Sequence, residues 1–261
     1  MPTPFYHLSV AEELLCHLDL TGEARSFLEA QRGAFLFGNT APDVQVVSSQ
    51  PRQDTHFFDL PLRSGKRPPW EQILHEHPSL RHASRLPAAQ AAFVTGYLCH
   101  LQADWLWVKN IFVPIFGLHS PWGNFTQRLY LHNVLRAYLD RQILPGLTNG
   151  VCTHLGEASP SGWLPFVADE HLRQWRDLLV NQLRPEAPIQ TVEVFAARQG
   201  IPPGEFYRIL DSEEEMKREV FSHITRQSLN SYRQRLVDEN LHLIKKYLGE
   251  NDPRRFSHES H

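Results

Sequence analysis

The chain has 261 residues and a net charge of −3 with histidine neutral, and 41% of its residues are hydrophobic and 21% charged. This is enough apolar sequence for a sizeable core, and the charge gives no bulk signal for nucleic-acid binding. The three cysteines form no C-x-x-C pair, which argues against a disulfide framework or a cysteine zinc knuckle. The N-terminal residues lack a secretory pattern, and no uncharged apolar run reaches about 18 residues, so we expect no transmembrane segment and a cytoplasmic location.

Helical patterns dominate the start of the chain. Ser9 followed by Glu12 has the spacing of a capping box, so the first predicted helix follows Ser9 and leaves His7 just outside its N-terminus. A second helix is predicted for residues 22–31, ended by Gly33. Residues 34–69 have no clear periodicity and predict a long loop of the kind that is usually functional.

A long helix is predicted for residues 87–110. Its apolar spacing places His100 and Asp104 on the buried face, one turn apart. Gly96 lies one turn before His100, although glycine inside a helix costs about 1 kcal/mol relative to alanine. We therefore expect Gly96 to make room for a partner element or a ligand beside the imidazole.

The remaining chain is also mainly helical in pattern. Helices are predicted for residues 125–141, 169–183, 191–199 and 213–248, with a Gly- and Pro-rich connection at 145–161 and a polar tail from 251. No strand pattern appears, so we predict an all-α fold, a multi-helix bundle. We expect residues 1–145 to form a metal-binding helical core and residues 146–261 to add helices that pack on it within the same domain.

Side chains of the types that bind transition metals are spread over the first 104 residues. They are His7, Asp43, His56, His100 and Asp104. Imidazole nitrogen and carboxylate oxygen are the preferred ligands of such ions. Because His100 and Asp104 lie one turn apart, they can bind one ion from one side, and Asp43 and His56 can close the site from loops. A buried histidine hydrogen-bonded to its neighbour is the alternative interpretation of the helical pair. The full set predicts a metal site between helices and loops, for zinc or manganese.

Four short motifs follow one another in this part of the chain. They are a histidine near the first helix (His7), G-x-x-x-P-D (residues 38–43), T-H-F (residues 55–57) and G-Y-x-x-H-x-x-x-D (residues 96–104). In this order they resemble the zinc-dependent phospholipase C family, which is related to the secreted single-strand nucleases. The resemblance covers about residues 1–140 and implies an all-α fold with metal ions bound between helices.

The resemblance also implies roles for the ligand-type residues. Asp43, His56, His100 and Asp104 would surround one ion, and Asp104 would bridge to a second ion held with His7. In the family a free amino terminus completes the second site. This chain begins instead with an initiator methionine, so one or two divalent ions are expected.

A third family site uses an H-x-x-x-E pair on the next helix. The matching positions here are His132 and Arg136. Arginine stays protonated and cannot bind a metal ion, so a trinuclear centre is not expected. Arg136 would instead contact a substrate phosphate.

These residues together predict a metal-dependent hydrolase of phosphoric esters, a phospholipase C-like phosphodiesterase. Metal-activated water would attack phosphorus, and Asp43 would accept a proton from that water. The expected partner is a phosphoester small molecule or a lipid head group. The alternative is a non-catalytic helical protein with a structural metal, which differs from a catalyst in lacking an open coordination position.

Overall fold

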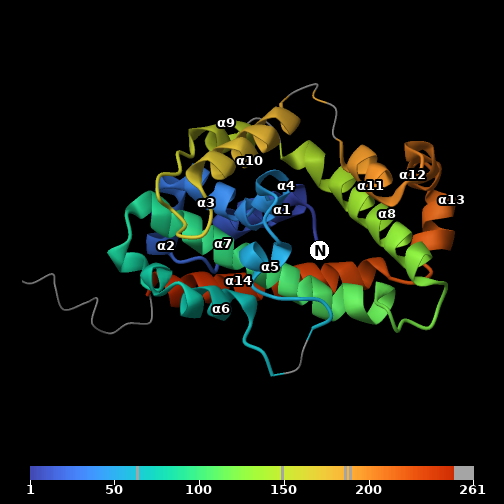
Figure 1. Ribbon diagram of the computed structural model, residues 1–261, viewed down its shortest axis with the longest axis horizontal. Coiled ribbons are helices and arrows are strands. Elements are labelled where there is room, and N and C mark those ends of the chain that lie inside the picture. Colours follow the sequence, from blue (N-terminus) through green and yellow to red (C-terminus); the bar gives the residue numbers. More distant parts are fainter. Residues whose placement is uncertain (63–64, 148–149, 185–186, 188–189, 250–261) are drawn as a thin grey trace, which may run out of the picture.

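A computed structural model describes residues 1–62, 65–147, 150–184, 187 and 190–249 (Figure 1). These residues form helices and no strand, which confirms the predicted all-α fold class. None of their helices has the length and apolar character needed to cross a bilayer. The elements are α1 (Pro4–Cys16), α2 (Gly22–Ala30), α3 (Arg32–Gly38), η1 (Ala41–Val44), α4 (Gln45–Ser48), α5 (Arg52–His56), α6 (Pro69–Glu76), η2 (Pro78–Leu80), η3 (Ala83–Arg85), α7 (Ala88–Trp107), η4 (Val108–Phe116), α8 (Phe125–Ile143), η5 (Leu144–Gly146), α9 (Gly150–Glu157), α10 (Asp169–Gln182), α11 (Thr191–Gln199), α12 (Pro203–Leu210), α13 (Glu213–Glu215), η6 (Met216–Val220) and α14 (Arg226–Leu248).

Helix α7 is the central element of the fold. Every residue from 91 to 104 is buried, as expected for a helix that is apolar on all sides. α3 and α14 make its most extensive contacts, and α1 and α6 also touch it. The helix predicted for residues 87–110 is thus present, and its last part continues as the π-helical η4.

α3 and α7 approach each other at two glycines. A Cβ atom at Gly96 would lie 2.2 Å from the carbonyl oxygen of Phe35, and one at Gly38 would lie 2.0 Å from that of Phe93. Neither position therefore accepts a larger side chain without movement of the backbone. The partner element expected beside Gly96 is α3, and the contact brings the end of α3 against the turn that carries His100.

The first helix begins earlier than predicted. Thr3 caps α1 by accepting a hydrogen bond from the Tyr6 amide at 3.2 Å, and Pro4 occupies the first helical position. This combination is favourable at a helix start and prevails over the capping-box pattern at Ser9. The Ser9 hydroxyl instead donates to the Tyr6 carbonyl. The prediction for His7 was wrong on this point, because His7 lies inside α1 and is buried.

Short helices account for the other differences. Much of residues 34–69, expected as loop, belongs to α3, η1, α4, α5 and α6, and α9 lies within the expected connection at 145–161. Helices of a few residues show too little periodicity to be recognised in sequence. Gly33 also does not end a helix but lies inside α3.

The predicted long helix over residues 213–248 is interrupted. α13 and η6 precede a new start at α14, where the Thr225 side chain accepts a hydrogen bond from the Ser228 amide. α12 was not predicted. The predicted polar tail from residue 251 lies outside the described residues.

The hydrophobic core includes residues from both sides of the predicted boundary at 145. Two hydrogen bonds tie the C-terminal helices to the metal-ligand region. Trp175 on α10 donates its indole N–H to the Thr40 carbonyl at 2.8 Å, and Tyr232 on α14 donates its hydroxyl to the Ala103 carbonyl at 3.0 Å. The C-terminal helices therefore help to fix the elements that carry Asp43 and Asp104.

Asp140 joins three helices inside the protein. Its carboxylate, 1% exposed on α8, accepts hydrogen bonds from the hydroxyl groups of Thr3 at the start of α1 and Thr191 at the start of α11. Burial raises the pKa of Asp140 to about 6. The group therefore ionises in the folded protein only at a cost.

We expect Asp140→Asn to stabilise the protein at neutral pH and to have little effect near pH 4. The folded-state pKa lies above the unfolded value, so wild-type stability is fully present below the unfolded pKa and falls as pH rises through about 6. Asparagine keeps an acceptor for Thr3 and gains a donor for Thr191 but cannot ionise. The variant's advantage in urea unfolding should grow by about 2–3 kcal/mol between about pH 4 and pH 8. A difference that is constant with pH would contradict this assignment.

Candidate metal centre

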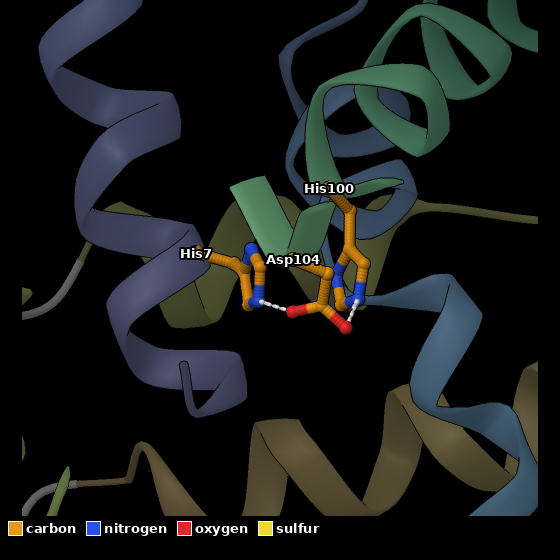
Figure 2. A group of neighbouring side chains, drawn as sticks. All are labelled: His7, His100 and Asp104. Carbon is orange, nitrogen blue, oxygen red and sulfur yellow. Dashed lines mark ion pairs between the residues drawn. The ribbon is translucent and has the colours of Figure 1, made fainter. Parts of the chain in front are cut away.

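The five predicted ligands come from four elements and converge in the core. His7 lies on α1, Asp43 in η1, His56 at the end of α5, and His100 and Asp104 on α7. Two overlapping groups, His7–His100–Asp104 and Asp43–His56–His100, each have ligand atoms within 4.8 Å of one another and can hold a metal ion. Figure 2 shows the first group, with the Asp104 carboxylate facing the His7 and His100 rings.

Asp104 lies at the centre of the cluster. Its Oδ1 is 3.4 Å from His7 Nε2, and its Oδ2 is 3.4 Å from His56 Nε2 and 3.8 Å from His100 Nε2. Asp43 Oδ1 lies 3.5 Å from His56 Nε2. These separations are longer than ordinary N–H···O hydrogen bonds. Three of the four, at 3.4–3.5 Å, match the spacing of about 3.3–3.6 Å between ligand atoms that each lie about 2.0–2.2 Å from one tetrahedral ion.

Several of these atoms have no hydrogen-bond partner. They are Nε2 of His7, His56 and His100, and Oδ1 of Asp104, all buried. Leaving such an atom buried and unpaired costs about 1–3 kcal/mol. These atoms belong to the two overlapping groups that share His100, so a cation in either group would satisfy several of them at once. The donor set therefore fits a divalent ion.

The imidazoles are in the form that binds metals. Burial lowers the pKa of His7 to about 4, and it also lowers the pKa values of His56 and His100. All three rings are neutral at pH 7, so each has a nitrogen lone pair. Neutral imidazole is the ligand form of histidine.

Neighbouring groups orient the rings. His100 Nδ1 donates to the Asn39 carbonyl at 2.8 Å, which leaves Nε2 as the free acceptor. His56 Nδ1 lies 3.0 Å from Thr55 Oγ1, and the Tyr97 hydroxyl donates to the Thr55 carbonyl at 2.5 Å. Such outer contacts fix the tautomer and direction of metal-binding histidines.

The end of α5 is conformationally unusual. Phe57, directly after His56, has a φ of 60°, in the left-handed region. Non-glycine residues in this region are strained and persist where surrounding contacts impose them. Here Phe57 packs edge-on against Phe166, with ring centroids 5.2 Å apart. This turn ends α5 and leaves His56 pointing into the cluster.

Both carboxylates are ionised. Burial opposes this for Asp104, but the His7 imidazole beside it and the charges nearby, including Arg52, hold the pKa of Asp104 well below its usual range. Arg52 Nη2 lies 2.6 Å from Asp104 Oδ2. Burial likewise opposes ionisation of Asp43, yet its interaction with His56 lowers the pKa of Asp43 to about 2. The cluster thus offers two negative charges to a cation.

A cavity of about 590 Å³ adjoins the cluster, and Asp43, Arg52 and Arg136 lie in its wall. The side chain of Asp43 is 19% exposed, whereas that of Asp104 is 1% exposed. Asp43 is therefore the member of the cluster that a molecule in the cavity can reach.

The structure does not bring His132 into the cluster. Its Nε2 accepts a hydrogen bond from the Trp107 indole N–H at 2.9 Å, and its ring packs on Phe112 and Phe116. Neither potential metal group among the described residues includes it. Arg136 lies one turn further along α8 and reaches the cavity, away from this aromatic packing.

Sequence reasoning missed Arg52 and Asn39. Arg52 precedes His56 by four residues, which is helical spacing, but the five-residue α5 lies in a stretch read as loop. Asn39 contacts His100 through its backbone carbonyl. Every residue has such a carbonyl, so the residue type does not predict this contact. Comparisons of the chain with protein-family models, curated proteins and solved structures give no match, so the resemblance to the zinc-dependent phospholipases C stays a prediction.

Proposed function

We propose that this protein is a divalent-metal-dependent hydrolase of phosphoric esters. The observation that carries the proposal is a buried His/Asp cluster that opens, through Asp43, into a cavity with Arg52 and Arg136 in its wall. The cluster is suited to a metal ion, and guanidinium groups are suited to phosphoryl oxygens. The motifs resembling the zinc-dependent phospholipases C point to the same chemistry.

Each group has a distinct task in this proposal. A divalent ion held by the histidines and carboxylates supplies Lewis acidity and lowers the pKa of water. Asp43, ionised and accessible from the cavity, accepts the proton of the attacking water. Arg52 holds Asp104 in place and adds positive charge at the edge of the cavity where the phosphoryl group would lie.

Openness of the site favours catalysis over a purely structural ion. Structural zinc sites are closed by four protein ligands, whereas catalytic sites keep one position for water or substrate. Here the cluster borders a cavity large enough for a small organic ligand. A purely structural metal site would explain neither this cavity nor the arginines in its wall.

The ligand set also bears on the identity and number of ions. Three neutral imidazoles with two carboxylates favour zinc, with manganese as a second choice. His100 belongs to both potential groups, and Asp104 directs its two oxygens to His7 and His56. We therefore propose one firmly held ion and a weaker second position on the His7 side.

We expect the protein purified without added metal to retain about one equivalent of a divalent ion, and to lose phosphoester hydrolysis when a chelator removes it. Elemental analysis and turnover of nitrophenyl phosphomonoesters and phosphodiesters, before and after chelation and zinc or manganese addition, measure both. Metal content below about 0.2 equivalents that reconstitution does not raise would overturn the metal centre. A full equivalent without turnover of any ester would leave only a structural ion.

A further inference from the structure

Arg136 is a half-buried arginine, and the carboxylates that act on its charge, Asp140 first, do so from beyond ion-pair distance. No ion pair among the described residues includes Arg136, and its Nε atom is buried without a hydrogen-bond partner. Nη1 donates to Asn133 Oδ1 at 2.9 Å, and the guanidinium lies 4.3 Å from the centre of the Phe195 ring. Burial lowers the pKa of Arg136 to about 10, so it is still charged at neutral pH. The guanidinium therefore has N–H groups left to donate to an anion in the cavity.

The wall of the cavity has the opposite charge balance to the chain as a whole. The chain carries a net charge of −3, yet the ionisable side chains of the lining are three arginines, Arg52, Arg136 and Arg198, and a single carboxylate, Asp43. Asp43 also belongs to the metal cluster. Because Arg52 is already paired with Asp104, Arg136 and Arg198 carry the excess positive charge of the wall, which attracts anions.

Much of the rest of the wall is apolar. α1 contributes Phe5, α10 contributes Leu178 and Leu179, and α11 contributes Val194 and Phe195. Phe195 lies directly against Arg136. The charged group and the apolar surface are therefore adjacent, so one ligand can use both.

We propose that this cavity binds an organic phosphate through its apolar substituent, and that Arg136 is the specificity-determining residue that holds phosphoryl oxygens not bound to the metal ion. The phosphoryl identity of the anion rests on the proposed function. The need for an anion with an apolar substituent rests on the lining alone. Phe195 holds the guanidinium plane through a cation–π contact, and Asn133 fixes one of its nitrogens, which leaves the other N–H groups for the ligand.

The test uses two non-hydrolysable probes, phenylphosphonate and methylphosphonate, titrated calorimetrically into the full chain. The measurement is made on zinc-loaded and on chelator-treated protein. We expect phenylphosphonate to bind at least about 10-fold more tightly than methylphosphonate, because only the phenyl group reaches the apolar wall. In Arg136→Gln the affinity for phenylphosphonate should fall at least about 10-fold in both forms.

Arg136→Lys and Arg141→Gln serve as matched variants. Lysine keeps the charge but not the planar fork and should restore part of the affinity. Arg141 lies on the same helix as Arg136 but pairs with Asp211 and is not part of the cavity wall, so its loss should change binding less than about 3-fold. Melting curves of each variant separate loss of binding from loss of folding.

Each result decides between the two proposals. Wild-type protein that binds neither probe, or Arg136→Gln that folds and binds phenylphosphonate as the wild type does, overturns the role of Arg136 even if zinc-dependent hydrolysis is found. Arg136-dependent binding in a protein that hydrolyses no ester supports this inference and removes the proposed catalytic function.

Discussion

Replacing Asp104 with asparagine is expected to lower the affinity of the protein for divalent ions by at least about 10- to 100-fold. Losses of this size follow mutation of residues that only hydrogen-bond to metal ligands, and Asp104 is itself a proposed ligand. Asparagine keeps the size of the side chain but removes one of the two negative charges of the cluster. Asp104 is 1% exposed and lies within 3.8 Å of all three imidazoles. Any phosphoester hydrolysis should disappear with the ion, because no other carboxylate among the described residues lies within 4.0 Å of all three imidazoles.

The same substitution frees Arg52 from its buried partner. Zinc titration by calorimetry, melting temperature and phosphoester turnover should therefore be measured on one preparation. Asp54→Asn is the matched control, since Asp54 is an exposed carboxylate on the same helix as His56, and it should keep wild-type metal content. A folded Asp104→Asn protein with unchanged zinc affinity would show that the ion binds elsewhere.

Gly96→Ala is expected to destabilise the protein by about 3 kcal/mol or more, towards the upper end for overpacked cores. The new Cβ atom would lie 2.2 Å from the Phe35 carbonyl oxygen and 2.9 Å from the Asn39 amide nitrogen. These are backbone atoms of α3 and the residue after it, so relief requires the two segments to separate. Because the Asn39 carbonyl holds His100, separation should also weaken metal binding.

Gly204→Ala provides the control for this prediction. Gly204 lies in α12, and a Cβ atom there would meet nothing within 4 Å. Alanine should stabilise that helix by about 0.5–1 kcal/mol relative to glycine. Urea unfolding of the two variants compares the same chemical change in opposite environments. Equal effects at the two positions would mean that α3 and α7 do not approach as closely as described.

Part of the site could be predicted from the sequence, because the side chains that bind metal ions can be recognised from residue type alone. Histidine and aspartate at helical spacing, as in His100 and Asp104, indicate a shared face before any tertiary contact is known. The residue type of His7 is enough to predict a ligand, although the sequence pattern predicts too late a start for its helix. Its position inside α1 depends on Thr3 and Pro4, whose signal competed with the capping-box pattern at Ser9.

His132 shows the limit of motif order. Its place in the predicted motif suggested a further ligand, but its Nε2 faces Trp107, a partner 25 residues away. Only the packing of α8 against η4 and against Trp107 at the end of α7 decides what that nitrogen contacts. Arg52 and Asn39 could not be predicted from sequence for a related reason. Arg52 lies in a five-residue helix, and Asn39 contacts His100 through its backbone carbonyl.

The sequence by itself determined the helical class of the fold, the buried central helix and the residue types available to bind a metal ion. Local periodicity and side-chain chemistry are enough for these, because they depend on residues a few positions apart. Tertiary structure alone decided which ligands meet, that three imidazole nitrogens are left without hydrogen-bond partners, and that Arg136 faces the cavity beside Asp43. Those features depend on contacts between segments far apart in the chain, above all the close packing of α3 on α7 that Gly38 and Gly96 permit.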